Sequence, residues 1–179
     1  VFSDYMKPAV RLAALMGIPV KFIWTHDAFR VGEDGPTHEP VEQEAQIRLM
    51  EKLKNHKGQD SVRVFRPADA DETTVCWQMA NENMDTPTAM ICSRQNVNSL
   101  PEGTDYSQVR KGAYIVKDDP NYDVILLASG SEVSTLLAGA ELLNADGIKT
   151  RIVSVPSEGL FRTQSKEYQE SVLPKGAKI

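Results

Sequence analysis

Residues 20–54 read VKFIWTHDAFRVGEDGPTHEPVEQEAQIRLMEKLK. The stretch opens with the apolar run Val20–Thr25, which is typical of a buried β-strand, and closes with Val41–Lys54, whose apolar spacing predicts a helix. Between them, residues 26–40 combine two histidines, two glycines, two prolines and several carboxylates. Polar residues that follow a buried strand are the usual site of chemistry in α/β proteins, because the strand end fixes them while the loop exposes them. This stretch therefore predicts an α/β fold and a functional loop.

The residue types in this loop allow three interpretations. His26 and His38 with acidic neighbours suggest a metal site, but their spacing matches no common zinc pattern and neither cysteine lies nearby, so we predict no metal here. A solvated acidic turn is the second interpretation. The third is a polar loop, shaped by the turn at Gly35-Pro36, that grips a hydroxylated or phosphorylated substrate. The residues by themselves leave the last two open.

The chain continues this alternation of strand and helix on both sides of the loop. Such alternation is typical of mostly parallel sheets flanked by helices. Pro8 suits the first turn of a helix and Gly17 suits its end. In this part of the chain we predict helices at residues 5–16, 41–54 and 69–83, and strands at residues 20–25, 62–65 and 88–92.

We predict a second α/β domain, truncated at residue 179, after a linker. Residues 96–111 break the alternating pattern with asparagine, serine, proline and glycine. Beyond them we predict strands at 113–116, 124–128 and 151–155 and an amphipathic helix at 131–144. The predicted division is therefore 1–95, linker 96–111 and 112–179. The turn Ser129-Gly130-Ser131 offers backbone N–H groups to an anion, although a plain turn with Ser131 as helix cap is the more economical interpretation.

Composition narrows the class of protein. The 179 residues carry a net charge of −5 without any Lys/Arg block, which argues against a nucleic-acid partner. No apolar run is long enough to cross a membrane and no signal peptide is visible, so we expect a cytoplasmic protein with no membrane partner. Cys76 falls in a helical pattern and Cys92 in a strand pattern, and we expect both to be reduced, buried and small hydrophobes.

Several motifs together resemble the transketolases. Thr25-His26-Asp27 followed by residues 31–38, VGEDGPTH, is similar to the signature in the pyrimidine-binding domain of these thiamine-diphosphate enzymes. Residues 66–69, RPAD, and 93–96, SRQN, resemble two further family segments in the same order. Residues 2–15 resemble the helix that precedes the strand. Related families carry a similar turn, but His26-Asp27 and the SRQN segment favour transketolase.

The resemblance implies a partial pyrimidine-binding domain of the thiamine-diphosphate-binding fold, followed by the start of the transketolase C-terminal domain. The parent enzyme would transfer a two-carbon ketol unit from a ketose phosphate to an aldose phosphate in the pentose phosphate pathway, as a cytoplasmic homodimer. Its cofactor would be thiamine diphosphate with a divalent metal (Mg or Ca), whose ligands lie outside this chain. We therefore expect the isolated chain, which lacks its own diphosphate-binding domain, to be inactive. The alternatives are another thiamine-diphosphate enzyme, such as 1-deoxyxylulose-5-phosphate synthase, and a non-catalytic binding module.

The resemblance also assigns roles to individual residues. Imidazoles and a carboxylate suit the hydroxyls of a sugar phosphate, and a planar guanidinium suits its phosphate. Aromatic side chains suit the aminopyrimidine ring of the cofactor, although aromatics at helical spacing are more often core anchors. The implied set is His38 as catalytic residue, His26, Asp34, His38 and Arg94 as substrate ligands, and Phe2 and Tyr5 as cofactor contacts.

Two segments depart from the family pattern. Ala28-Phe29-Arg30 replaces the usual Ser-Ile-Gly and brings an aromatic ring and a charge to the rim of the loop. Residues 52–61 form a longer link between helix and strand than is usual, in a surface stretch where insertions cost little.

Overall fold

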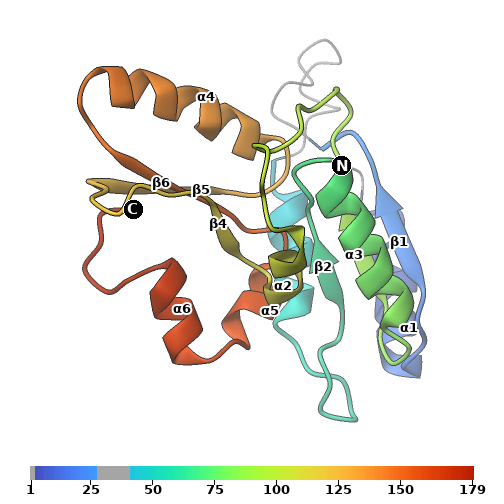
Figure 1. Cartoon of the computed structure of the whole chain (residues 1–179). Coiled ribbons are helices and arrows are strands. Elements are labelled where there is room, and N and C mark those ends of the chain that lie inside the picture. Colours follow the sequence, from blue (N-terminus) through green and yellow to red (C-terminus); the bar gives the residue numbers. More distant parts are fainter. Residues whose placement is uncertain (1–2, 28–40) are drawn as a thin grey trace. The chain divides into compact units, whose positions relative to one another are not determined.

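The computed structural model describes residues 3–27 and 41–179. Their contacts divide the chain into two compact units (Figure 1). The first unit is Val1–Phe65 with Cys76–Asn96, and the second is Arg66–Val75 with Val97–Ile179.

The first unit is built on a parallel sheet of three strands, β1 (Lys21–Trp24), β2 (Arg63–Phe65) and β3 (Thr88–Ile91), in the order β1-β3-β2. The central strand β3 pairs with both neighbours, and all four of its residues are buried. Continuous burial is expected of a strand that is covered on both faces. The three strands confirm the prediction of a parallel sheet from residues 20–25, 62–65 and 88–92.

Three helices accompany this sheet, and each is slightly shorter than predicted. They are α1 (Lys7–Met16), α2 (Gln43–Glu51) and α3 (Ala70–Glu82). Pro8 lies in the first turn of α1, and Gly17 ends that helix with a φ of 65°, a left-handed conformation that glycine adopts without strain. The predicted boundary signals of α1 are therefore confirmed.

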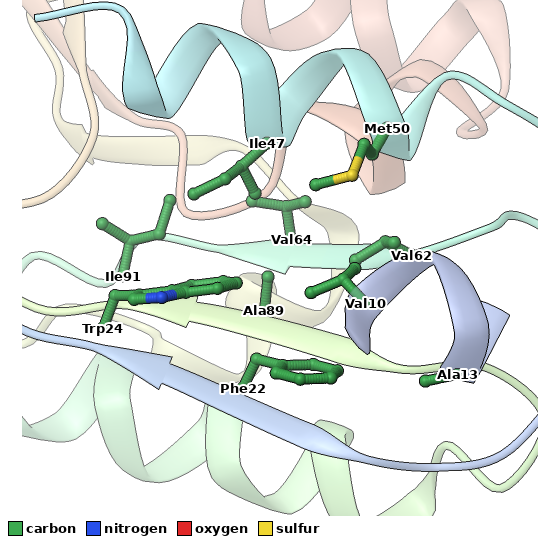
Figure 2. Close-up of a cluster of buried hydrophobic side chains, with 10 residues drawn as sticks. All are labelled: Val10, Ala13, Phe22, Trp24, Ile47, Met50, Val62, Val64, Ala89 and Ile91. Atoms are coloured by element: carbon green, nitrogen blue, oxygen red, sulfur yellow. The ribbon is translucent and has the colours of Figure 1, made fainter. Parts of the chain in front are cut away.

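The core of the first unit lies between the sheet and helices α1 and α2. Figure 2 shows Phe22 and Trp24, which alternate with the half-exposed Ile23 along β1, facing Ile47 of α2 and Val10 of α1. The two aromatic rings stack with centroids 5.9 Å apart. Because side chains two residues apart in a strand share a face, the run predicted from sequence places both rings in the core.

The two cysteines differ from each other in burial. Cys76 lies on α3 and is buried, as predicted, whereas Cys92 follows β3 and is only partly buried. The prediction of a fully buried Cys92 is wrong because β3 ends at Ile91, where the chain turns toward the surface. Neither cysteine forms a disulfide within the described part of the chain.

The second unit contains a mixed sheet of β4 (Tyr114–Lys117), β5 (Val124–Ala128) and β6 (Thr150–Ser154), in the order β4-β6-β5. β5 and β6 are parallel, and β4 runs antiparallel to β6. Figure 1 shows α4 (Glu132–Ala145) on one face of this sheet. The other face is covered by α5 (Glu158–Arg162) and α6 (Lys166–Val172), whose Phe161, Tyr168 and Val172 pack on Ile125 and Val153.

The predicted linker contains structure of its own. Residues Tyr106–Lys111 form a 3₁₀ helix, whose start is capped by the side chain of Asp105 accepting a hydrogen bond from the backbone N–H of Ser107. Asp69, the residue before α3, accepts hydrogen bonds from the backbone N–H of Leu100 (2.9 Å) and from the hydroxyl of Tyr106 (2.6 Å). The segment before the second sheet is therefore tied down by one buried carboxylate.

A second buried carboxylate, Glu72, lies in the first turn of α3. It accepts hydrogen bonds from the hydroxyls of Tyr114 (2.8 Å) and Ser154 (2.6 Å) and from the backbone N–H of Ala68 (2.7 Å). Burial raises the pKa of Glu72, and the charge of the nearby Asp69 raises it further, while the three hydrogen bonds oppose that rise. The acidic start predicted for this helix is confirmed, since Asp69 accepts from the backbone N–H of Glu72 (2.8 Å).

Arg66 occupies the turn between β5 and α4. Its guanidinium donates to the backbone carbonyl and the hydroxyl of Ser129 and pairs with Glu132, and its backbone bonds to Gly130. The possible anion site at residues 129–131 is therefore filled by a cation. The expected cap is also wrong, because the hydroxyl of Ser131 makes no capping bond and instead donates to the Glu132 carboxylate (3.1 Å).

We predict that Gly130→Ala lowers the free energy of unfolding by about 1–3 kcal/mol. Gly130 has a φ of 62°, and a Cβ there would lie 2.8 Å from the guanidinium carbon of Arg66. Gly139→Ala is the matched control, because that glycine lies inside α4 and the added Cβ would meet no atom within 4 Å beyond its chain neighbours and the nearby backbone of its own helix, so this variant should gain about 0.5–1 kcal/mol. Urea titration of both variants measures the difference, and equal stabilities would contradict the prediction.

We also predict that Glu72→Gln becomes more stable relative to the parent chain as the pH rises from 4.5 to 7.5. The raised pKa means that folded Glu72 keeps its proton at a pH where the unfolded chain, with the ordinary value of 4.5, has lost it. The stabilisation from the protonated form is therefore complete at low pH and disappears as the pH rises through the folded pKa, by up to about 1.4 kcal/mol per pH unit.

The amide of glutamine carries no such dependence. Urea titrations at each pH measure the difference between the two proteins, and Glu44→Gln, at a partly exposed position of α2, serves as the control. A difference that does not change with pH would show that Glu72 is ionised throughout.

Candidate functional site

Two loop segments meet at the carboxyl edge of the first sheet. β1 and β3 end side by side, with Trp24 paired to Ile91. The pairing extends beyond the strands, because the N–H of Cys92 donates to the carbonyl of Trp24 (2.8 Å) and the N–H of Asp27 donates to the carbonyl of Cys92 (3.1 Å). The segments 25–27 and 92–94 therefore leave the sheet as neighbours. This is the edge at which parallel sheets carry their ligands.

His26 has an unusual backbone conformation. Its φ is 64°, and it is the one non-glycine residue with a positive φ in the described part of the chain. Residues held in this region cost free energy and cluster at functional sites. The hydroxyl of Thr25 lies 2.9 Å from Nδ1 of the His26 ring. The exposed side chain of His26 is therefore held next to the end of β1 by its backbone conformation and by its contact with Thr25.

The neighbouring segment supplies a different chemistry. Arg94 is exposed and follows β3 by three residues, so the structure brings its segment next to that of His26. Burial and the charge of Asp27 raise the pKa of the Cys92 thiol. A thiol with a raised pKa stays protonated near neutral pH and is a poor nucleophile. The edge is therefore suited to hydrogen bonding and phosphate binding rather than to thiol chemistry.

Gln43, the first residue of α2, is tied to the segment before α1. Its amide oxygen accepts a hydrogen bond from the backbone N–H of Ser3 (2.9 Å) as well as from the Ser3 hydroxyl, and its amide nitrogen donates to Asp4 (2.8 Å). Ser3 and Gln43 are both buried. The sequence interpretation missed this pair. The sequence gives one sign of this pair, a glutamine at an inward-facing position of α2. Hydrophobic periodicity does not show which residue it bonds to.

The remaining predicted residues have different outcomes. Tyr5 lies just before α1 with 85% of its side chain exposed, so the core-anchor interpretation is wrong for it. Phe2, Asp34 and His38 lie outside the described residues, as do Phe29 and Arg30. Among residues 3–27 and 41–179, no group of three or more His, Cys, Asp and Glu side chains is placed to hold a metal ion. In that same part of the chain, no helix is long and apolar enough to cross a membrane.

Comparison with known proteins gives two family matches. Residues 1–99 match the family described as transketolase, pyrimidine binding domain, and residues 112–179 match the transketolase-like TK C-terminal domain. The chain is 48% identical over 175 residues to a probable transketolase of Streptococcus pneumoniae, and 49% identical over 177 residues to a transketolase of Halalkalibacterium halodurans. Each alignment covers 97% of this chain and 25% of the relative.

Solved structures give the same result. The transketolase of Leishmania mexicana superposes with a TM-score of 0.87 at 40% identity, and the H261F mutant of the Pichia stipitis transketolase with a TM-score of 0.86 at 39% identity. Each superposition covers 98% of this chain and 25% of the solved chain. The chain thus spans about a quarter of the length of the relatives that it matches. By its motifs, its fold and these matches, the chain belongs to the transketolase family.

Proposed function

We propose that the full-length protein containing this chain transfers a two-carbon ketol unit from a ketose phosphate to an aldose phosphate. The observation that carries the proposal is the pairing at the carboxyl edge, which brings the His26 and Arg94 segments together within a chain of this family. One Pichia stipitis transketolase structure that this chain resembles is described as a complex with sedoheptulose 7-phosphate. The proposed substrates are therefore sugar phosphates.

Within this proposal, each site residue binds a different group of the substrate. His26 contributes its imidazole to a hydroxyl of the substrate. Arg94 pairs its planar guanidinium with the phosphate. Asp34 accepts a hydrogen bond from a further hydroxyl, and His38 moves a proton to or from the reacting oxygen. In the sequence, Asp34 and His38 lie between Asp27 and Gln43.

Thiamine diphosphate, with its divalent metal, would supply the electron sink for breaking and forming the carbon–carbon bond. Tyr5 fits a contact with its aminopyrimidine ring, because a large aromatic side chain here is open rather than packed in the core. We propose the same contact for Phe2. The ligands of the diphosphate and the metal are proposed to lie in the part of the protein outside this chain, so the isolated chain should not catalyse the reaction.

The cellular setting completes the proposal. We infer a homodimer in which this pyrimidine-binding domain faces the diphosphate-binding domain of a second subunit, acting in the cytoplasm and in the pentose phosphate pathway.

We retain residues 1–95, 96–111 and 112–179 as domain, linker and second domain. The alternative of a 1-deoxyxylulose-5-phosphate synthase is not favoured, because the curated relatives that match at 47–49% identity are named transketolases.

An assay of the full-length protein tests the proposal directly. Xylulose 5-phosphate with ribose 5-phosphate should give ketol transfer, whereas pyruvate with glyceraldehyde 3-phosphate should give no product. Turnover of the second pair and not of the first would overturn the proposed function.

For Arg94→Ala in the full-length protein, we predict a KM for phosphorylated sugars raised by roughly 10- to 150-fold, which corresponds to the loss of a charge-assisted hydrogen bond of about 1.5–3 kcal/mol. The KM for unphosphorylated sugars should change little. Steady-state kinetics with both substrate types measure the difference. Arg162→Ala, an exposed arginine of the second unit, is the control. An equal effect of Arg94→Ala on both substrate types would assign a structural role to this residue.

For the loop, we predict that replacing His26, Asp34 or His38 by alanine lowers kcat/KM strongly and leaves thiamine-diphosphate affinity nearly unchanged, because the diphosphate is held elsewhere. Asp34→Ala should also reduce discrimination between sugars that differ at one hydroxyl, since a site that bonds one configuration leaves its own group unpaired with the other. Kinetics with paired epimeric acceptors measure this.

Glu33→Ala removes the same charge from the adjacent position and is the matched control. If Asp34→Ala discriminates between epimers as well as the parent enzyme, the role proposed for Asp34 is wrong.

A further inference from the structure

A surface pocket of about 280 Å³ lies in the first unit, at the opposite edge of the sheet from the candidate site. Its lining includes Val62, the residue immediately before β2, and Ala14 and Leu15 from the last turns of α1. The pocket therefore lies at the amino ends of the strands, whereas His26 and Arg94 follow the carboxyl ends. None of the functions proposed above uses it.

The floor of the pocket is apolar and fixed in place. Val10, Met50 and Val62 line it, and all three are buried members of the core cluster. Figure 2 shows these three side chains gathered at one end of that cluster, beside Ala13. A ligand seated here would contact side chains whose positions the packed core already determines.

One wall comes from the segment 52–61. This segment is folded on itself, with a β-bridge between Lys54 and Asp60. The side chain of Asn55 accepts hydrogen bonds from the backbone N–H groups of Lys57 (2.9 Å) and Gln59 (3.1 Å). Asn55 also lines the pocket, so this folded segment forms a defined wall.

The mouth of the pocket is positively charged. Arg11, Lys54 and His56 contribute to the lining, and no carboxylate does. Lys54 pairs with Asp60. The side chains of Arg11 and His56 have no hydrogen bond or ion pair with any residue in the described ranges. An apolar floor beneath an unpaired guanidinium complements a ligand that combines an apolar tail with a negative charge.

We propose that this pocket binds a small amphipathic carboxylate, with the tail against Val10, Met50 and Val62 and the carboxylate at Arg11. The pocket volume lies just below the range of about 300–1,000 Å³ for drug-sized ligands, which points to a small molecule. Octanoate is therefore a suitable probe. The proposal does not depend on the transketolase function, because the pocket lies at the other edge of the sheet.

Titration of the isotope-labelled chain with octanoate, followed by NMR, tests the proposal. Saturable shifts should map to Val10, Ala14 and Val62. Octylamine, with the same tail and the opposite charge, and inorganic phosphate, a charge without a tail, should each bind much more weakly. Equal binding of octylamine, or shifts that map elsewhere, would overturn the proposal. Concentration-dependent shifts of the same residues without ligand would also overturn it, since a second copy of the chain would then fill the pocket.

Matched variants separate the two parts of the site. Arg11→Gln should weaken octanoate binding by about fivefold, as expected for one partly solvated charge contact. Leu15→Glu places a carboxylate at the mouth and should weaken it further. Leu12→Glu and Lys52→Gln alter comparably exposed residues that do not line the pocket, and they should bind octanoate like the parent chain. Equal losses in the variants and their controls would exclude this site.

Discussion

The pairing of β1 with β3 is the constraint on which the candidate site depends. Parallel strands joined in register end at the same edge, and here two further backbone hydrogen bonds, through Cys92 and Asp27, carry the pairing past the last strand residues. Backbone groups make these bonds, so they position the His26 and Arg94 segments whatever side chains follow. Core packing of Phe22 and Trp24 holds β1 in this register, because a slip by one residue would turn both rings away from the core.

Much of the fold could be predicted from the sequence because its strands are short apolar runs and its longer helices have clear boundary signals. The antiparallel direction of β4 could not be predicted, because the direction of a strand relative to its neighbour depends on which strand it pairs with. The short α5 and α6 have too few residues to show a period. Ser131 has the residue type of a cap, but its hydroxyl bonds to the neighbouring Glu132 instead.

The candidate site was predictable in a different way. His26 and Arg94 were found by motif, and the structure adds what no motif contains, namely the positive φ of His26 and the adjacency of the two segments. The anchor of Gln43 on Ser3 joins residues 40 positions apart, and neither residue type signals it. Partners that are distant in the chain depend on tertiary packing, which local pattern does not record.

The buried carboxylates at the start of α3 have a consequence for how the chain can be divided. Residues 66–75 group with the second unit, where Glu72 accepts from the hydroxyls of Tyr114 and Ser154. A piece of the protein that began at the linker would keep both hydroxyls and lose their acceptor, and it would also lose Arg66 from the turn at Gly130. Gene fusions or recombination events that join the two halves at the linker would therefore need to carry the segment 66–75 along with the C-terminal sheet.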